Sequence, residues 1–166
     1  MIDLKRNIKK IISAILIFCV LVTFIACTDK TNKPNKETPS QDGAQQITVM
    51  YIYVNGNKLE VTLADNRAVT ALVEILEQGD ITYTANDYGG FEKVGSIGRS
   101  LPTENTQITT EAGDVILYSG NQIVLFYGSN SWSYTRLGKI NGYSASELRT
   151  LLGAGSGSVQ VRISLA

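Results

Sequence analysis

Histidine is absent from this chain of 166 residues. The absence excludes catalysis by Ser-His-Asp or Cys-His groups, and it excludes most zinc sites. Cysteine occurs only at Cys19 and Cys27. Beyond residue 27 the chain therefore has no disulfide and no free thiol, and packing alone must stabilise its fold. No pattern typical of a flavin or metal site is present, so we predict neither a cofactor nor a metal.

The chain also lacks an excess of positive charge. Basic and acidic residues number 15 each, so the formal net charge is zero. Four basic residues and one acidic residue precede residue 27, so 11 basic and 14 acidic residues remain, a net charge of −3. Proteins that bind nucleic acids neutralise phosphates with basic side chains. We therefore exclude nucleic acid as a partner.

The chain begins with a basic segment and an apolar run. Residues 5–10 read "KRNIKK", and residues 11–26 read "IISAILIFCVLVTFIA". A positive start, an apolar stretch and a small residue at the cut are typical of a secretory signal peptide, which we place at residues 1–26. The alternative is an uncleaved membrane anchor, although the run is shorter than the roughly 20 residues that span a bilayer.

The sequence "FIAC" at the end of this run resembles the lipobox of bacterial lipoproteins. The resemblance implies that Cys27 carries the lipid and becomes the new N-terminus. Two acyl chains on that residue are enough for stable attachment to a membrane. We therefore expect a protein held by Cys27 on the extracytoplasmic face of the cell membrane.

Residues 27–45 are polar and contain no large apolar side chain. Such a segment cannot bury enough surface to offset the entropy of ordering, which predicts a disordered tether. The folded domain is predicted from residue 46 to residue 166. Its length suits one globular domain.

The domain is predicted to be mainly β. Apolar periodicity and turn residues indicate strands in the following segments: 47–54, covered on both faces; 58–64, after the Asn-Gly turn "NGNK"; 80–85; two hairpin arms within 112–128 that turn at 119–121; 131–140; and 156–166. Residues 86–98 are predicted to be a glycine-rich loop with short extended pieces. A terminal strand that pairs with the first would close the sheet.

Two helices are predicted. The first follows Asp65 or Asn66 as N-cap and carries an apolar stripe at 69, 72, 73 and 76. The second begins with a capping box of Ser144 and Glu147 and ends at Gly153. About eight antiparallel strands and two helices favour a small closed barrel, because closure removes exposed sheet edges.

The domain contains the segments "VNGNKLEVTLADNRAVTALVEIL", "SLPTE", "GDVILYSGNQIVLFYGSNSWSYTRLGKI" and "GSGSVQVRIS". With these segments, residues 47–166 resemble the cyclophilin-like fold proteins of bacteria and archaea. The resemblance implies a closed eight-stranded barrel with two flanking helices, in agreement with the pattern above. It implies no activity, because that family has no established one to transfer.

True cyclophilins are prolyl isomerases, and their motif Phe-His-Arg-Val supplies a key arginine. The segment "FEKV" at 91–94 is similar, but Glu92 stands in place of the His and Lys93 in place of the Arg. A compact ammonium group is a poor substitute for a planar guanidinium. A divergent peptidyl-prolyl cis-trans isomerase is therefore the alternative to a non-catalytic binding module for a peptide, a small molecule or an envelope protein.

Candidate ligand-binding residues occur in "SWSYTRLGKI", which contains the only tryptophan of the chain. Residues two apart on a strand share a face, so Trp132, Tyr134 and Arg136 are predicted to point one way, with Gly138 and Ile140 following. Aromatic rings beside an arginine can grip a planar or anionic group. The alternative is that the rings only cover the barrel wall and that Arg136 pairs with a carboxylate.

Secondary candidates are Tyr127 on the preceding strand and Tyr88 in the glycine-rich loop. Asp87 and Glu92 lie in the same loop and could form an acid pair. The interpretation that we prefer is that both carboxylates are solvated, as surface charges usually are.

Overall fold

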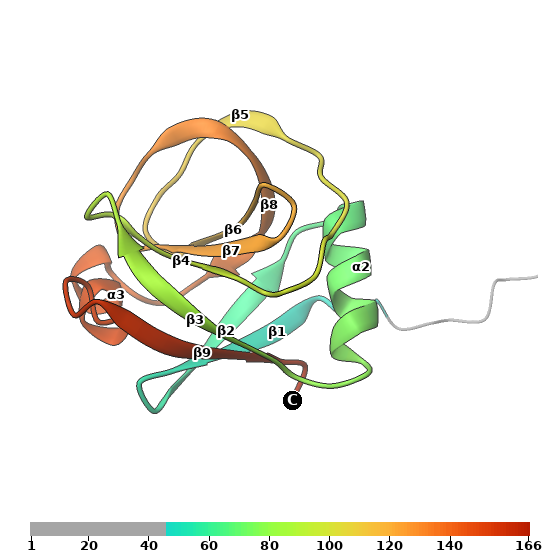
Figure 1. Cartoon of the computed structure of the whole chain (residues 1–166), viewed down its shortest axis with the longest axis horizontal. Helices are drawn as coiled ribbons and strands as arrows, with labels where there is room; N and C mark the ends of the chain where they lie inside the picture. The colour runs from blue at the N-terminus through green and yellow to red at the C-terminus, as the bar shows by residue number, and fades with distance from the viewer. Residues whose placement is uncertain (1–45) are drawn as a thin grey trace, which may run out of the picture. The chain divides into compact units, whose positions relative to one another are not determined.

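The computed structural model describes residues 46–166, which contain nine strands and two helices (Figure 1). In chain order these elements are β1 (Val49–Val54), β2 (Asn57–Leu63), α2 (Arg67–Leu76), β3 (Ile81–Tyr88), β4 (Glu92–Ser96), β5 (Thr106–Thr109), β6 (Asp114–Tyr118), β7 (Gln122–Phe126), β8 (Ser131–Ile140), α3 (Ala145–Leu151) and β9 (Ser158–Ser164). The predicted leader, tether and Cys27 lie outside the described residues.

Eight of the strands form a closed antiparallel barrel, as predicted. Their order is β2-β1-β9-β3-β4-β7-β6-β8, and the pairing of β2 with β8 closes the ring. Gly138 lies in the closing pair opposite Leu63. A Cβ atom there would lie 2.5 Å from the carbonyl oxygen of Thr62, so only glycine lets the two strands approach this closely.

Apolar side chains that point inward fill the barrel. On β1, Met50, Ile52 and Val54 are buried. The side chains on the other face of β1 are only partly buried among the described residues, so the expectation of a strand covered on both faces was wrong. Tyr51 and Tyr53 are half-buried there beneath cationic side chains. On this face of β1, long cationic side chains therefore shield the two rings from solvent.

The two helices lie on opposite sides of the strands in Figure 1. Asn66 caps α2, since its side chain accepts a hydrogen bond from the N–H of Val69. Ser144 and Glu147 form the predicted capping box of α3. Both helix predictions are confirmed. Within residues 46–166, neither helix is long and apolar enough to cross a bilayer.

Three strands depart from the sequence prediction. Strand β4 lies inside the segment that was expected to be mainly loop, and β3 extends through Tyr88. Strand β5 was not predicted, and it pairs only with the first half of β8. In Figure 1, β5 and this half of β8 curve away from the ring and lie above β4, β6 and β7. We call this pair of segments, residues 106–109 and 131–134, the arch.

Candidate ligand-binding cleft

A cleft of about 460 Å³ lies between the arch and the outer face of the barrel. We call it the aromatic cleft, and it is lined by Tyr88, Glu92, Val94, Tyr118, Gln122, Asn130, Trp132 and Tyr134. Its volume is in the range of sites that hold small molecules. Three of the five candidate residues from the sequence, Trp132, Tyr134 and Tyr88, are thus brought together.

The path of β8 explains why Trp132 and Tyr134 border a cleft. Residues 135–139 of β8 pair with β6 in the barrel wall, whereas residues 131–134 pair with β5 instead. Along the chain, β8 therefore joins the barrel wall only after Tyr134. Both rings face the same side because they are two residues apart. Trp132 is 57% exposed at the rim, while Tyr134 is buried.

The floor of the cleft is a second apolar cluster, separate from the main core. It contains Ile116, Val124, Phe126 and Tyr134, with Phe91, Val94 and Ile108 packed against it. Neighbouring rings contact one another in a row. Phe91 stacks on Phe126 at 6.1 Å between centroids, and Phe126 meets Tyr134 edge-on at 5.8 Å. Tyr134 in turn meets Tyr118, which lies beside the cluster, edge-on at 6.0 Å. Such contacts hold the rings in fixed orientations.

Among the described residues that line the cleft, Glu92 is the only acidic one. It lies on β4 opposite Tyr88 on one side and Phe126 on the other. The residue is 6% exposed, and its Oε2 atom is buried without a hydrogen-bond partner. Burial raises the pKa of Glu92 to about 7. The expectation that this carboxylate is solvated was wrong, because the apolar cluster surrounds it.

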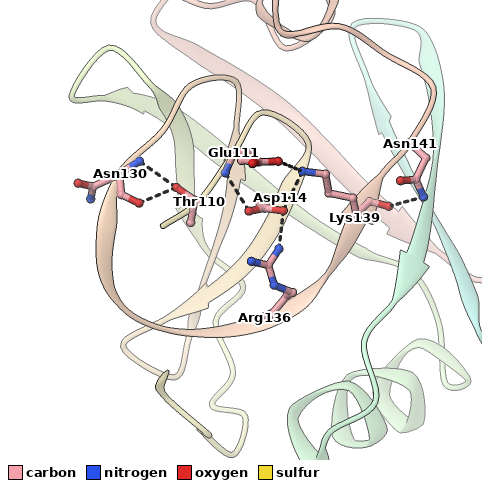
Figure 2. A network of polar contacts seen from close by, with 7 residues as sticks. All are labelled: Thr110, Glu111, Asp114, Asn130, Arg136, Lys139 and Asn141. Carbon is pink, nitrogen blue, oxygen red and sulfur yellow. Dashed lines mark hydrogen bonds and ion pairs between the residues drawn. The ribbon is translucent and has the colours of Figure 1, made fainter. Parts of the chain in front are cut away.

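Hydrogen bonds fix the wall beside Tyr134. Asn130 donates from Nδ2 to the Tyr134 hydroxyl at 2.9 Å. The backbone of Asn130 is held in turn by Thr110, which both accepts from its N–H and donates to its carbonyl (Figure 2). Burial raises the pKa of Tyr134, so its hydroxyl keeps its proton at neutral pH. The phenol is therefore a positioned neutral group.

Arg136 does not line the cleft, although the sequence grouped it with Trp132 and Tyr134. Figure 2 shows its guanidinium directed at Asp114, to which it donates at 2.5 Å. The same carboxylate accepts from Lys139 at 3.0 Å and from the N–H of Glu111 at 2.9 Å. This network ties β8 to β6. The alternative weighed for Arg136, pairing with a carboxylate, is the arrangement present.

A β-bulge also changes the second half of β8. Val115 on β6 is opposite Gly138, but the next residue, Ile116, is opposite Arg136. Leu137 is therefore an extra residue, and the alternation of faces shifts there. Leu137 and Ile140 both lie in the main core. The prediction that Gly138 and Ile140 follow the face of Trp132 was wrong for this reason.

Tyr127 is also outside the cleft. It is 2% exposed in the main core, and its hydroxyl donates to Asp87 at 2.9 Å. Burial and this hydrogen bond raise the pKa of Tyr127 to about 12. The ring is thus a packing residue that helps to hold a buried ion pair.

That ion pair joins Lys93 and Asp87 at 2.9 Å. Lys93 is fully buried and also donates to the carbonyl of Gly157 at 2.6 Å. Partial burial pushes the pKa of Asp87 upward, but hydrogen bonds from Lys93, Tyr127 and two backbone N–H groups outweigh it and hold the pKa at about 2. Asp87 and Glu92 do not form an acid pair, since they have separate surroundings.

The sequence analysis missed Glu92, Val94, Tyr118, Gln122 and Asn130 as cleft residues. The signal available for Glu92 and Val94 was their two-residue spacing in "FEKVGS", which puts both on one face if the segment is a strand. In the part of the chain described here, no group of three or more acidic, histidine or cysteine side chains is placed to hold a metal ion.

The fold and the site define a class: a closed antiparallel β-barrel protein with an aromatic cleft on its outer face. A sequence model described as "Cyclophilin-like family" matches residues 52–164. The chain belongs to this family, which confirms the resemblance drawn from its sequence.

One solved structure supports the same fold. The solution structure of a hypothetical protein from Archaeoglobus fulgidus is 20% identical, with a TM-score of 0.56, and the match covers 75% of this chain and all of that one. A structure of McbB in complex with tryptophan matches at 17% identity and a TM-score of 0.49, covering 69% of this chain and 44% of that one. No curated protein is found to match. The archaeal match shows a shared fold and assigns no activity.

Proposed function

We propose that this protein is a lipid-anchored, extracytoplasmic binding module that holds a small ligand in the aromatic cleft. The observation that carries the proposal is the cleft itself, which is lined by four aromatic side chains and by Glu92, whose Oε2 atom has no hydrogen-bond partner. Buried polar groups are normally hydrogen-bonded, so an unpaired carboxyl oxygen beside a concave, mostly apolar site supports the proposal of a ligand there.

A ligand panel tests the binding proposal. Trp132 is the sole tryptophan and stands at the rim, so its fluorescence reports occupancy of the cleft in the full-length chain. Tyr118→Ala should weaken binding about tenfold, since it removes one ring of the lining. Tyr143→Ala is the matched control, because Tyr143 is 39% exposed outside the cleft and Tyr118 is 38% exposed. A broad panel without any saturable response would contradict the proposal.

The anchoring proposal rests on the leader and on the "FIAC" sequence before Cys27. Labelling of cells with a radioactive fatty acid, followed by fractionation, tests it. We expect label in the membrane fraction for the natural chain and no label for Cys27→Ser. An unprocessed chain in the cytoplasmic fraction with a free thiol at Cys27 would refute this part of the proposal.

The isomerase alternative has less support. Of the residues that line the cleft, none is basic. Arg136 is engaged by Asp114, and Lys93 is buried in its pair with Asp87. A protease-coupled isomerisation assay on the full-length chain should therefore give only the uncatalysed rate. Activity that disappears in Arg136→Ala would favour the isomerase instead.

A further inference from the structure

The cleft has the composition of a site for a cation. Its aromatic lining residues are Tyr88, Tyr118, Trp132 and Tyr134, and the faces of aromatic rings carry negative electrostatic potential. Glu92 adds an acidic group at the floor. Since the described lining contains no lysine or arginine, nothing in it offsets this negative character. An anionic ligand would be repelled here.

The rings are also arranged as walls rather than as a flat stack. The planes of Tyr118 and Tyr134, which both line the cleft, meet at 71°. Ring faces in different orientations can contact several sides of a compact, roughly spherical group. Alkylated ammonium groups have this shape, and their charge is spread over their methyl or methylene surface.

Glu92 supplies the polar complement. Its Oε2 atom has no partner, and none of the ion pairs among residues 46–166 involves it. By contrast, the carboxylates of Asp87 and Asp114 are each held by several donors. A charge buried without a counter-ion is costly, and a cationic ligand would remove that cost.

Resting on the proposed function, we infer that the ligand of the aromatic cleft is a small organic cation with an alkylated ammonium group. Its alkyl surface contacts Tyr88, Tyr118, Trp132 and Tyr134, and the Glu92 carboxylate is its counter-ion. The volume of about 460 Å³ accommodates a small solute of this class as a whole.

A matched pair of probes tests the inference. Choline and 3,3-dimethyl-1-butanol have nearly the same shape, but only choline is charged. Both are titrated into the full-length chain in a non-ionic maltoside detergent at pH 8, with Trp132 fluorescence as the readout. We expect choline to bind at least tenfold more tightly than the neutral alcohol.

Two variants locate the charge preference. Glu92→Gln keeps the shape of the side chain and should reduce choline affinity at least tenfold, with little change for the alcohol. Glu60→Gln is the control, because it removes the same charge at an exposed position of β2. Circular dichroism verifies that both variants fold.

The outcomes separate the inference from the proposed function. Equal affinity for choline and the alcohol, or an unchanged choline affinity in Glu92→Gln, overturns the cation inference while the cleft still stands as a binding site. A chain that responds to neither choline nor the alcohol also overturns the cation inference, and only silence across the broad ligand panel contradicts the proposed function as well. Phosphatidylcholine vesicles form a further arm: Glu92-dependent co-sedimentation assigns the ammonium group to a lipid headgroup, and choline binding alone assigns it to a free solute.

Discussion

Strand β4 buries a charged residue on each of its two faces, and the two residues have opposite surroundings. Lys93 is fully buried, pairs with Asp87 at 2.9 Å and donates to a backbone carbonyl. Glu92, its neighbour in sequence, is almost as buried, but its Oε2 atom has no partner. The first arrangement is complete without a ligand, whereas the second is not. The comparison distinguishes a charge that holds the fold together from one that is available for binding.

The largest expected effect on stability comes from breaking the ion pair between Lys93 and Asp87. Lys93→Met should lower the free energy of unfolding by about 3–5 kcal/mol, because it leaves the Asp87 carboxylate without its counter-ion. Denaturant titration at pH 7 measures the change. Arg99→Met, at an exposed position, is the control and should change stability by at most about 0.5 kcal/mol. A small effect at Lys93 would show that the pair is not structural.

Removal of the charge of Glu92, whose Oε2 atom has no partner, should stabilise the protein instead. The pKa of Glu92 is raised from 4.5 to about 7 in the folded chain. Between these values only the folded state keeps the proton, so the stability of the natural chain falls as pH rises, by about 3 kcal/mol in total. Glu92→Gln avoids this cost. It should be about 3 kcal/mol more stable than the natural chain at pH 8 and nearly equal at pH 4.

Denaturant titrations of both chains at the two pH values measure that difference. Two phenols close enough to sense the charge of Glu92 are those of Tyr134 and Tyr127. Burial raises the pKa of both, so neither ionises over this pH range. If Glu92→Gln were the less stable chain at pH 8, the carboxylate would have a partner that this structure lacks.

Asp87 gives a smaller effect at acid pH. Its folded pKa is lowered from 3.8 to about 2, so the stabilisation is complete above about pH 4 and is lost as pH falls toward 2. The natural chain should therefore lose about 2 kcal/mol over this range relative to Asp87→Asn. Urea titrations at pH 2 and pH 5 provide the measurement. Parallel pH profiles of the two chains would contradict the assignment.

The smallest effect on stability is expected at the rim of the cleft. Trp132 is 57% exposed, so Trp132→Ala should change the free energy of unfolding by less than about 1 kcal/mol. Choline binding should nevertheless weaken about tenfold, since one ring face is lost. Isothermal titration calorimetry replaces fluorescence for this variant. A large loss of stability with unchanged binding would place Trp132 in the fold rather than in the site.

The sequence was sufficient to predict the barrel because local chemistry determines its hairpins and helix ends. Asn55 and Gly56 both have positive φ, as the Asn-Gly turn between β1 and β2 requires. Ser119 and Gly120 also have positive φ, in the turn between β6 and β7. Inward alternation on the strands then leaves few ways to bury their apolar faces.

The cleft was predicted only in part, because it depends on pairings between distant segments. Strand β5 is four residues long and mostly exposed, so it leaves little apolar pattern. Leu137 gives no local sign that it is the extra residue of a bulge. The burial of Glu92 follows from β4 lying between β3 and β7, and the glycines on either side of β4 favoured a loop prediction. Trp132 and Tyr134 were found because their two-residue spacing puts both rings on one face of a strand, and Tyr88 because it lies in a glycine-rich segment.

The most direct test is a measurement of the Glu92 carboxyl pKa by carbon-13 NMR, with and without choline. We predict a pKa of about 7 in the free protein and a marked fall when choline is present, because a cation in the cleft stabilises the charged form. A pKa near 4.5 in the free protein, unchanged by choline, would mean that the carboxylate is already satisfied, and it would contradict the account of this cleft.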